Sequence, residues 1–102
     1  MGQTRKLGTA ATSVRSENGT THVRYHQTDV VSFNDHTVTL RTGGWETATT
    51  KSRMNQASNQ FGLKYGVSQR KGQWYVSRWN PETYTWFDEQ PFNPTGVHTF
   101  TR

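Results

Sequence analysis

The run Thr42–Arg53 gathers more side chains suited to polar chemistry than any other stretch of the sequence. Gly43 and Gly44 precede a series of hydroxyl-bearing residues, and basic residues follow where a helix is predicted to begin. The first N–H groups of a helix lack partners within the helix and carry partial positive charge, so they bind anions readily. We therefore predict a phosphate or anion site formed by Thr49, Thr50, Lys51 and Arg53. The alternative is a capped helix whose basic side chains are solvated near Glu46.

A second group of residues interleaves basic and aromatic side chains between Lys64 and Trp86. A strand over Gln73–Trp79 would place its even-numbered residues on one face and its odd-numbered residues on the other. One face must belong to the core, and the other would expose aromatic rings beside cations, where bases stack at about 1–3 kcal/mol each. We predict that Trp74 or Trp79 stacks on bases and that the nucleic-acid backbone is contacted by Arg70, Lys71 and Arg78. The alternative is that the helix and neighbouring loops cover both faces.

Histidines are the residues that acid/base catalysis or metal binding would use first. His22 and His26 lie four residues apart on one predicted strand face. Same-face neighbours two residues apart are already about 7 Å from each other, so this pair alone cannot hold one metal ion. The remaining catalytic hypothesis is a small nuclease in which His26 works with Lys51 or Arg53. The sequence favours a non-enzymatic protein, and we predict no catalytic residue, no metal ligand and no cofactor.

The composition limits which elements can position these residues. The chain has 102 residues, enough for one domain, and only 29% of them are hydrophobic, yet 13% are aromatic. Large rings bury much area each, so we expect a folded domain with a thin, aromatic core. The absence of cysteine excludes disulfides, zinc–thiolate sites and thiol nucleophiles, and no apolar run is long enough for a transmembrane helix. The net charge of +5 favours an anionic partner.

The order of predicted elements indicates an α+β fold, in which a mostly antiparallel β-sheet carries a single α-helix over about residues 50–61. Asn18-Gly19 is a strong two-residue hairpin signal near the start of the domain. Met54, Ala57 and Phe61 form the apolar stripe of the helix, and Gly62 is placed to end it. We expect residues 1–12 to be a flexible tail and residues 13–102 to be one domain.

Three segments together resemble a family of small proteins encoded by bacteriophages and related mobile elements. The segments are Tyr25-His26-x-Thr28-x-Val30-Val31, Thr42-Gly43-Gly44-Trp45-x-Thr47-x-Thr49-Thr50-Lys51-x-Arg53-Met54-Asn55-Gln56 and Gln73-Trp74-Tyr75-Val76. The resemblance covers roughly residues 21–92, and its specific part is the run from Gly43 to Gln56. It implies a phage accessory protein made in the bacterial cytoplasm, with the virion as an alternative location. It transfers no functional residue.

The leading functional hypothesis is a small, basic, phage-type protein that binds single-stranded or structured nucleic acid through a basic and aromatic sheet face and a helix N-terminus. The alternative is a protein–protein module, either an inhibitor of a host defence enzyme or a virion component, because exposed aromatic and arginine side chains also form interface hot spots. The nuclease is the lowest alternative. No membrane partner is predicted.

Overall fold

A computed structural model describes residues 11–102 of the chain. These residues form, in order, β1 (Thr12–Glu17), β2 (Thr20–Tyr25), β3 (Thr28–Phe33), β4 (Thr37–Arg41), α1 (Ala48–Phe61), β5 (Tyr65–Arg70), β6 (Gln73–Asn80), β7 (Thr85–Pro91) and β8 (Val97–Thr101). All strand pairs are antiparallel. The predicted α+β class is therefore confirmed, with α1 the one helix of the described residues.

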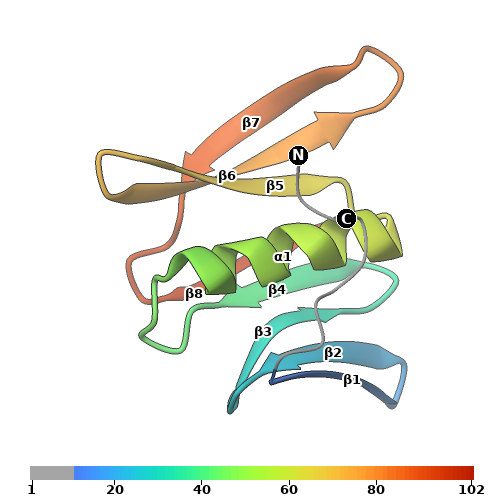
Figure 1. Ribbon diagram of the computed structural model, residues 1–102. Helices are drawn as coiled ribbons and strands as arrows, with labels where there is room; N and C mark the ends of the chain where they lie inside the picture. The colour runs from blue at the N-terminus through green and yellow to red at the C-terminus, as the bar shows by residue number, and fades with distance from the viewer. Residues whose placement is uncertain (1–10) are drawn as a thin grey trace.

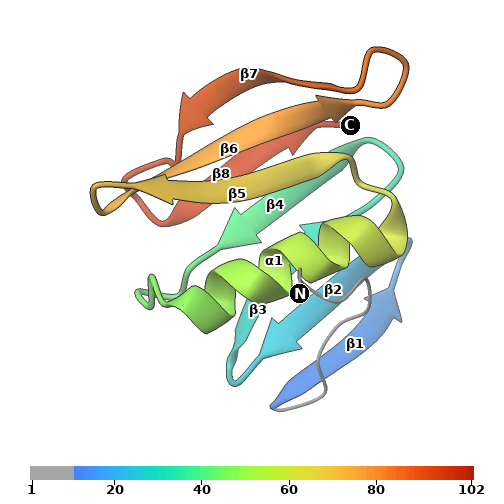
Figure 2. The ribbon, with the colours of Figure 1, turned by 45° about the horizontal axis from the view of Figure 1, so that its top comes forward.

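The strands divide between two sheets, which the sequence did not predict. One sheet has five strands in the order β1-β2-β3-β4-β8, and the other has three in the order β5-β6-β7. Figure 1 shows α1 lying across the five-stranded sheet and alongside β5, so the helix joins the two sheets. In Figure 2 the β6–β7 hairpin lies on the side of the molecule away from β1 and β2.

The core lies between α1 and the facing sides of the two sheets. Val38 and Leu40 of β4 point inward and are fully buried, as their alternation with polar residues predicts. From the helix, Met54 and Ala57 are fully buried, whereas Phe61 is only partly buried and packs on Phe33. Aromatic side chains fill the space that the few aliphatic residues leave.

The helix begins two residues earlier than predicted, because Thr47 is its N-cap. The Thr47 hydroxyl accepts a hydrogen bond from the Thr50 N–H at 3.2 Å, as capping threonines commonly do. At the other end Gly62 adopts the left-handed conformation, with φ of 65°, and ends the helix as predicted. The strand before the domain's first hairpin also begins early: Thr12, assigned to the tail, is the first residue of β1. Residues 1–10 of the predicted tail lie outside the described residues.

The polar side of α1 has a structural role. Asn55 donates to the Val67 carbonyl at 3.0 Å and accepts from the Val67 N–H at 2.7 Å. Ser58 makes the same two contacts with the carbonyl and N–H groups of Tyr65. These side chains therefore replace a neighbouring strand at the outer edge of β5 and remove the hazard of an unpaired edge. This pairing fixes α1 beside the three-stranded sheet.

Candidate nucleic-acid interface

The outer face of the three-stranded sheet, turned away from the core, carries exposed aromatic rings. Strand register places Trp79 directly opposite Trp86, and their ring centroids lie 5.0 Å apart. Tyr84 packs edge-on against Trp79 at 5.6 Å. The exposed fractions of Tyr84 and Trp86 are 80% and 57%, far above those of core aromatics. We call these three residues the aromatic cluster.

The Trp86 indole crosses the sheet from β7 and lies over Gly66 of β5. A Cβ atom added to Gly66 would approach the Trp86 ring to 2.7 Å, closer than real contacts allow. Gly66 has an ordinary backbone conformation, so no turn requires glycine at this position. The missing side chain instead allows the Trp86 ring to approach the backbone closely. Ser77 stands opposite Gly66 in the register, so a small residue also lies beneath the ring on β6.

A groove runs between the flank of α1 and this sheet face. Its volume is about 440 Å³, and it is lined by Asn55, Asn59, Tyr65, Gly66, Val67, Ser68, Ser77, Trp86 and Glu89. A second hollow of about 350 Å³ shares Trp86, Asn59 and Tyr65 with it and adds Lys64 and Trp79. Trp86 therefore stands in both hollows, with an amide and hydroxyl groups around it. We refer to the two together as the aromatic groove.

Cations lie at both ends of β5, which forms the floor of the aromatic groove. Lys64 lines the second hollow beside Trp79 and Trp86. At the far end, Lys51 of α1 donates to the Gln69 side chain at 3.3 Å, next to Arg70 and Lys71. A strand of this length separates the two ends by roughly 20 Å. The groove thus has positive charge at its ends and aromatic rings between them.

One carboxylate faces the groove, and an arginine neutralises it. Arg70 donates to both carboxylate oxygens of Glu89, at 2.6 and 3.0 Å, while its guanidinium lies 4.0 Å from the centroid of the Tyr75 ring. The hydrogen bonds from Arg70 hold the pKa of Glu89 below its ordinary value. This pair contributes no net charge to the groove.

Two of the predicted base and backbone contacts lie on the other face of the sheet. Trp74 is 1% exposed and packs edge-on against Phe92, so the prediction that it stacks on bases is wrong. Arg78 shares that inner face, with its guanidinium 5.5 Å from the Phe100 ring. Trp79, the alternative stacking residue, is half-buried within the aromatic cluster. Arg70 and Lys71 lie at the end of the hairpin described above.

The four residues of the predicted anion site at the start of α1 do not come together in the structure. Thr50 is 1% exposed, and its hydroxyl accepts a hydrogen bond from Thr47, so it has no surface for a phosphate. The Arg53 guanidinium donates to Thr12 and Gln56 and lies over the Tyr25 ring. Thr49 is exposed and Lys51 partly so, but Lys51 points toward β5. Lys51 is therefore the residue that joins the two basic regions.

Lys64, Tyr84 and Trp86 belong to the basic and aromatic group seen in the sequence, but the sequence prediction gave none of the three a binding role. The available signal was the hairpin itself: a turn over Asn80–Thr83 predicts that Trp79 and a residue near Trp86 pair across it and share one face. Identifying Trp86 as the partner of Trp79 requires the exact register of β6 and β7, which does not follow from the loop length alone.

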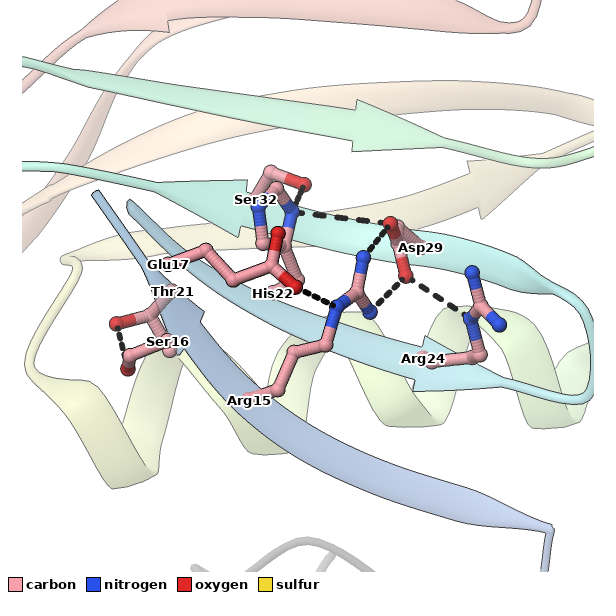
Figure 3. A network of polar contacts seen from close by, with 8 residues as sticks. All are labelled: Arg15, Ser16, Glu17, Thr21, His22, Arg24, Asp29 and Ser32. Atoms are coloured by element: carbon pink, nitrogen blue, oxygen red, sulfur yellow. Dashed lines mark hydrogen bonds and ion pairs between the residues drawn. The ribbon is translucent and has the colours of Figure 1, made fainter. Parts of the chain in front are cut away.

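The outer face of the five-stranded sheet carries a second polar cluster, shown in Figure 3. Arg15 binds both oxygens of Asp29 at 2.9 Å, and Arg24 adds a third contact at 3.2 Å. These hydrogen bonds, led by Arg15, lower the pKa of Asp29 to about 2. His22 Nδ1 lies 2.8 Å from the Ser32 hydroxyl and 3.7 Å from the same carboxylate. Because one ring nitrogen faces both groups, this is not the geometry of a catalytic triad.

The nuclease hypothesis depended on His26, which lies at a turn beside the start of α1. Its ring packs on Tyr25 at 4.4 Å, and a hollow of about 650 Å³ there is also lined by Trp45 and Thr47. The loop before the helix fits tightly against β3, since a Cβ at Gly43 would clash with the Thr28 hydroxyl. Arg53, whose guanidinium lies 5.4 Å from the centroid of the Tyr25 ring, is already hydrogen-bonded to Thr12 and Gln56.

Two searches of the described part of the chain bear on metals and membranes. Within residues 11–102, no group of three or more histidine, cysteine or acidic side chains gathers as a metal would require. In the same residues no helix has the length and apolar character needed to cross a membrane.

Comparison with known proteins gives one match. A family model described as "Kyanoviridae Gp96 protein" matches residues 2–98, which is nearly the whole chain. No curated protein and no solved structure matches it.

Proposed function

The chain belongs to the Kyanoviridae Gp96 family of phage proteins. We propose that this phage protein is a non-enzymatic accessory protein that binds single-stranded nucleic acid in the aromatic groove. The observation that carries the proposal is the combination of an exposed Trp86 with cations at both ends of β5. Proteins that bind single strands pair stacking rings with basic side chains in this way.

Each part of the groove would have a distinct role. Bases would stack on the Trp86 and Tyr84 rings, which are largely exposed. Phosphates would lie near Lys64 at one end and near Lys51 and Lys71 at the other. The Asn59 side chain, which lines both hollows and is exposed, would hydrogen-bond base edges.

The geometry favours a single strand over a duplex. In a duplex, base faces are stacked on one another and cannot reach a protein ring without unpairing. A single strand leaves each base face free, and a ring stacks on any base. The Trp86 ring lies over Gly66 with more than half of its surface exposed, so its contribution depends on free base faces.

The test is a titration of a fluorescently labelled single-stranded oligothymidylate at several salt concentrations, with the matching duplex as control. About three phosphate contacts predict that the logarithm of the affinity falls against the logarithm of salt with a slope near −2. The single strand should bind more tightly than the duplex at every salt concentration. Equal affinity for both, or no binding at low salt, would exclude the proposal.

A protein partner is the second candidate function, and a specific observation supports it. Residues 79–101 include Glu82, Asp88 and Glu89 but no lysine or arginine, in a chain of net charge +5. Phe87, on the face opposite Trp86, is also 46% exposed. Exposed aromatic residues in a segment without lysine match the composition of protein interfaces, where aromatic residues are enriched and lysine is depleted. A partner that remains bound after nuclease treatment, and that is lost with Phe87→Ser but retained with Trp86→Ala, would favour this function.

A further inference from the structure

Among the described residues, 11–102, the strand β7 pairs on one side only. It is the outermost strand of its sheet, after β5 and β6, and all seven of its residues are exposed. An open edge presents unpaired N–H and C=O groups to any strand that can lie beside it. On the opposite side of the same sheet, Asn55 and Ser58 of α1 cover the edge of β5. One edge of this sheet is therefore covered by the helix, and the other edge is open.

Backbone geometry identifies which groups of β7 face outward. The Trp79 N–H donates to the Lys64 carbonyl at 2.9 Å, so the main-chain polar groups of Trp79 point toward β5. Trp86 stands directly opposite Trp79. In an antiparallel pair, a residue opposite such a position does not exchange hydrogen bonds with it, so its own N–H and C=O point away. The Trp86 main chain therefore faces the open edge.

We propose that a second copy of this chain pairs with β7 in the antiparallel direction, with Trp86 on the twofold axis. The N–H and C=O of Trp86 would then exchange two hydrogen bonds with the same groups of the second copy. This arrangement is isologous, so the interface closes on itself after two copies. The six strands of the two small sheets would form one continuous sheet.

The charges of β7 are compatible with this register and disfavour the register centred on Asp88. With Trp86 on the axis, Thr85 lies opposite Phe87 of the second copy, and Tyr84 lies opposite Asp88. No two carboxylates then face each other. With the axis at Asp88, two carboxylates would stand directly opposite, which destabilises a strand pair.

Features beyond Phe87 keep the pairing short. Asp88 has a left-handed φ of 55°, next to a register shift between β6 and β7. Pro91 lacks an N–H group and occurs at strand edges for that reason. Bulges and prolines are the means by which natural edges avoid extended association. A pair of this length buries little area, so we expect a reversible dimer whose population depends on concentration.

The dimer would place two aromatic grooves on one face of a shared sheet. The Trp86 indole of each copy extends away from the axis, over Gly66 of the same copy, so the two grooves lie on either side of the axis and the binding surface doubles in length. Strand pairing does not require nucleic acid, so the dimer is independent of the proposed function. Only the ligand of the doubled surface rests on the proposed function. Failure of the dimer and failure of nucleic-acid binding can therefore be told apart.

Sedimentation velocity across a wide range of protein concentration tests the dimer, using two matched double variants. Thr85→Lys with Phe87→Lys places like charges across the axis, whereas Thr85→Glu with Phe87→Lys places opposite charges there. The variants differ only at the exposed Thr85. We expect wild type and the opposite-charge variant to shift from monomer to dimer with concentration, and the like-charge variant to stay monomeric. Circular dichroism checks that all three are folded.

Two results would overturn the inference. One is a wild-type protein that stays monomeric at the highest concentration reached. The other is a dimer that forms equally in the like-charge variant, which would place the interface elsewhere. Oligothymidylate binding by the wild type is measured in parallel. If the wild type binds but does not dimerise, the proposed function stands and the dimer is rejected. If the wild type dimerises but does not bind, the dimer stands and the proposed function is rejected.

Discussion

The two sheets each leave one face toward solvent, and the two faces use their side chains in opposite ways. On the five-stranded sheet, Arg15 and Arg24 both bind Asp29, and Arg15 also reaches Glu17. On the three-stranded sheet, Trp86 and Tyr84 extend into solvent. The first face satisfies its charges within the chain, and the second leaves its largest side chains without enough neighbours to bury them.

This difference separates stability from recognition. A carboxylate held by two arginines contributes to folding and presents little free charge to a partner. Exposed tryptophan contributes little to folding, because most of its apolar area stays in water. It gains free energy only when something covers it. We therefore expect substitutions on the five-stranded sheet to affect stability and substitutions on the three-stranded sheet to affect binding.

The largest expected effect is on the binding face. Trp86→Ala should weaken oligothymidylate binding by about 1–3 kcal/mol, because one stacking platform is lost. The matched control is Trp45→Ala, which removes a tryptophan that is 69% exposed in the loop before α1. Fluorescence anisotropy compares the two. Equal losses in both variants would mean that tryptophan content, and not the aromatic groove, determines binding.

The next effect is on the other face and on stability. Asp29→Ala should lower the free energy of unfolding by about 1–2 kcal/mol, since two arginines lose a partly buried partner. Oligothymidylate affinity should stay unchanged. Asp35→Ala, at an exposed turn, is the control for loss of a negative charge. Urea unfolding measures both variants, and a binding defect in Asp29→Ala would contradict the separation of the two faces.

The pH dependence of the free energy of unfolding tests the role of Asp29 in stability. The Asp29 pKa is about 2 in the folded protein, because Arg15 and Arg24 hydrogen-bond the carboxylate, and the pKa of an unfolded aspartate is about 3.9. Stability from Asp29 is therefore fully present above pH 4 and is lost as the pH falls toward 2. The difference in unfolding free energy between wild type and Asp29→Asn should be constant from neutral pH to about pH 5 and shrink below pH 4. A constant difference down to pH 2 would contradict this assignment.

The smallest expected effect concerns the support of Trp86. Gly66→Ala adds a Cβ that would lie 2.7 Å from the indole, so the ring must move. We expect a loss of about 1 kcal/mol in oligothymidylate binding, or roughly fivefold. In a Trp86→Ala background the same substitution should have no effect, which a double-mutant cycle measures. An equal loss in both backgrounds would show that Gly66 acts without Trp86.

Local patterns in the sequence predicted much of the fold. Alternation placed Val38 and Leu40 in the core, and helical spacing with Gly62 located most of α1. The division into two sheets was not predictable, because it depends on Asn55 and Ser58 closing the edge of β5 across the tertiary structure. Nor could alternation alone decide which face of β6 is buried: Trp74 and Trp79 fit either side equally. The choice follows from packing against β8 and Phe92, which is non-local.

The most direct test of the account follows the four indole N–H resonances in a two-dimensional NMR spectrum while oligothymidylate is added. The chain has four tryptophans in different environments: Trp74 is buried, Trp45 lies in the loop before α1, and Trp79 and Trp86 lie in the aromatic groove. We expect the resonances of Trp86 and Trp79 to shift and those of Trp45 and Trp74 to stay in place. Shifts confined to Trp45, or saturable binding that leaves Trp86 unmoved, would contradict the assignment of the groove as the binding site.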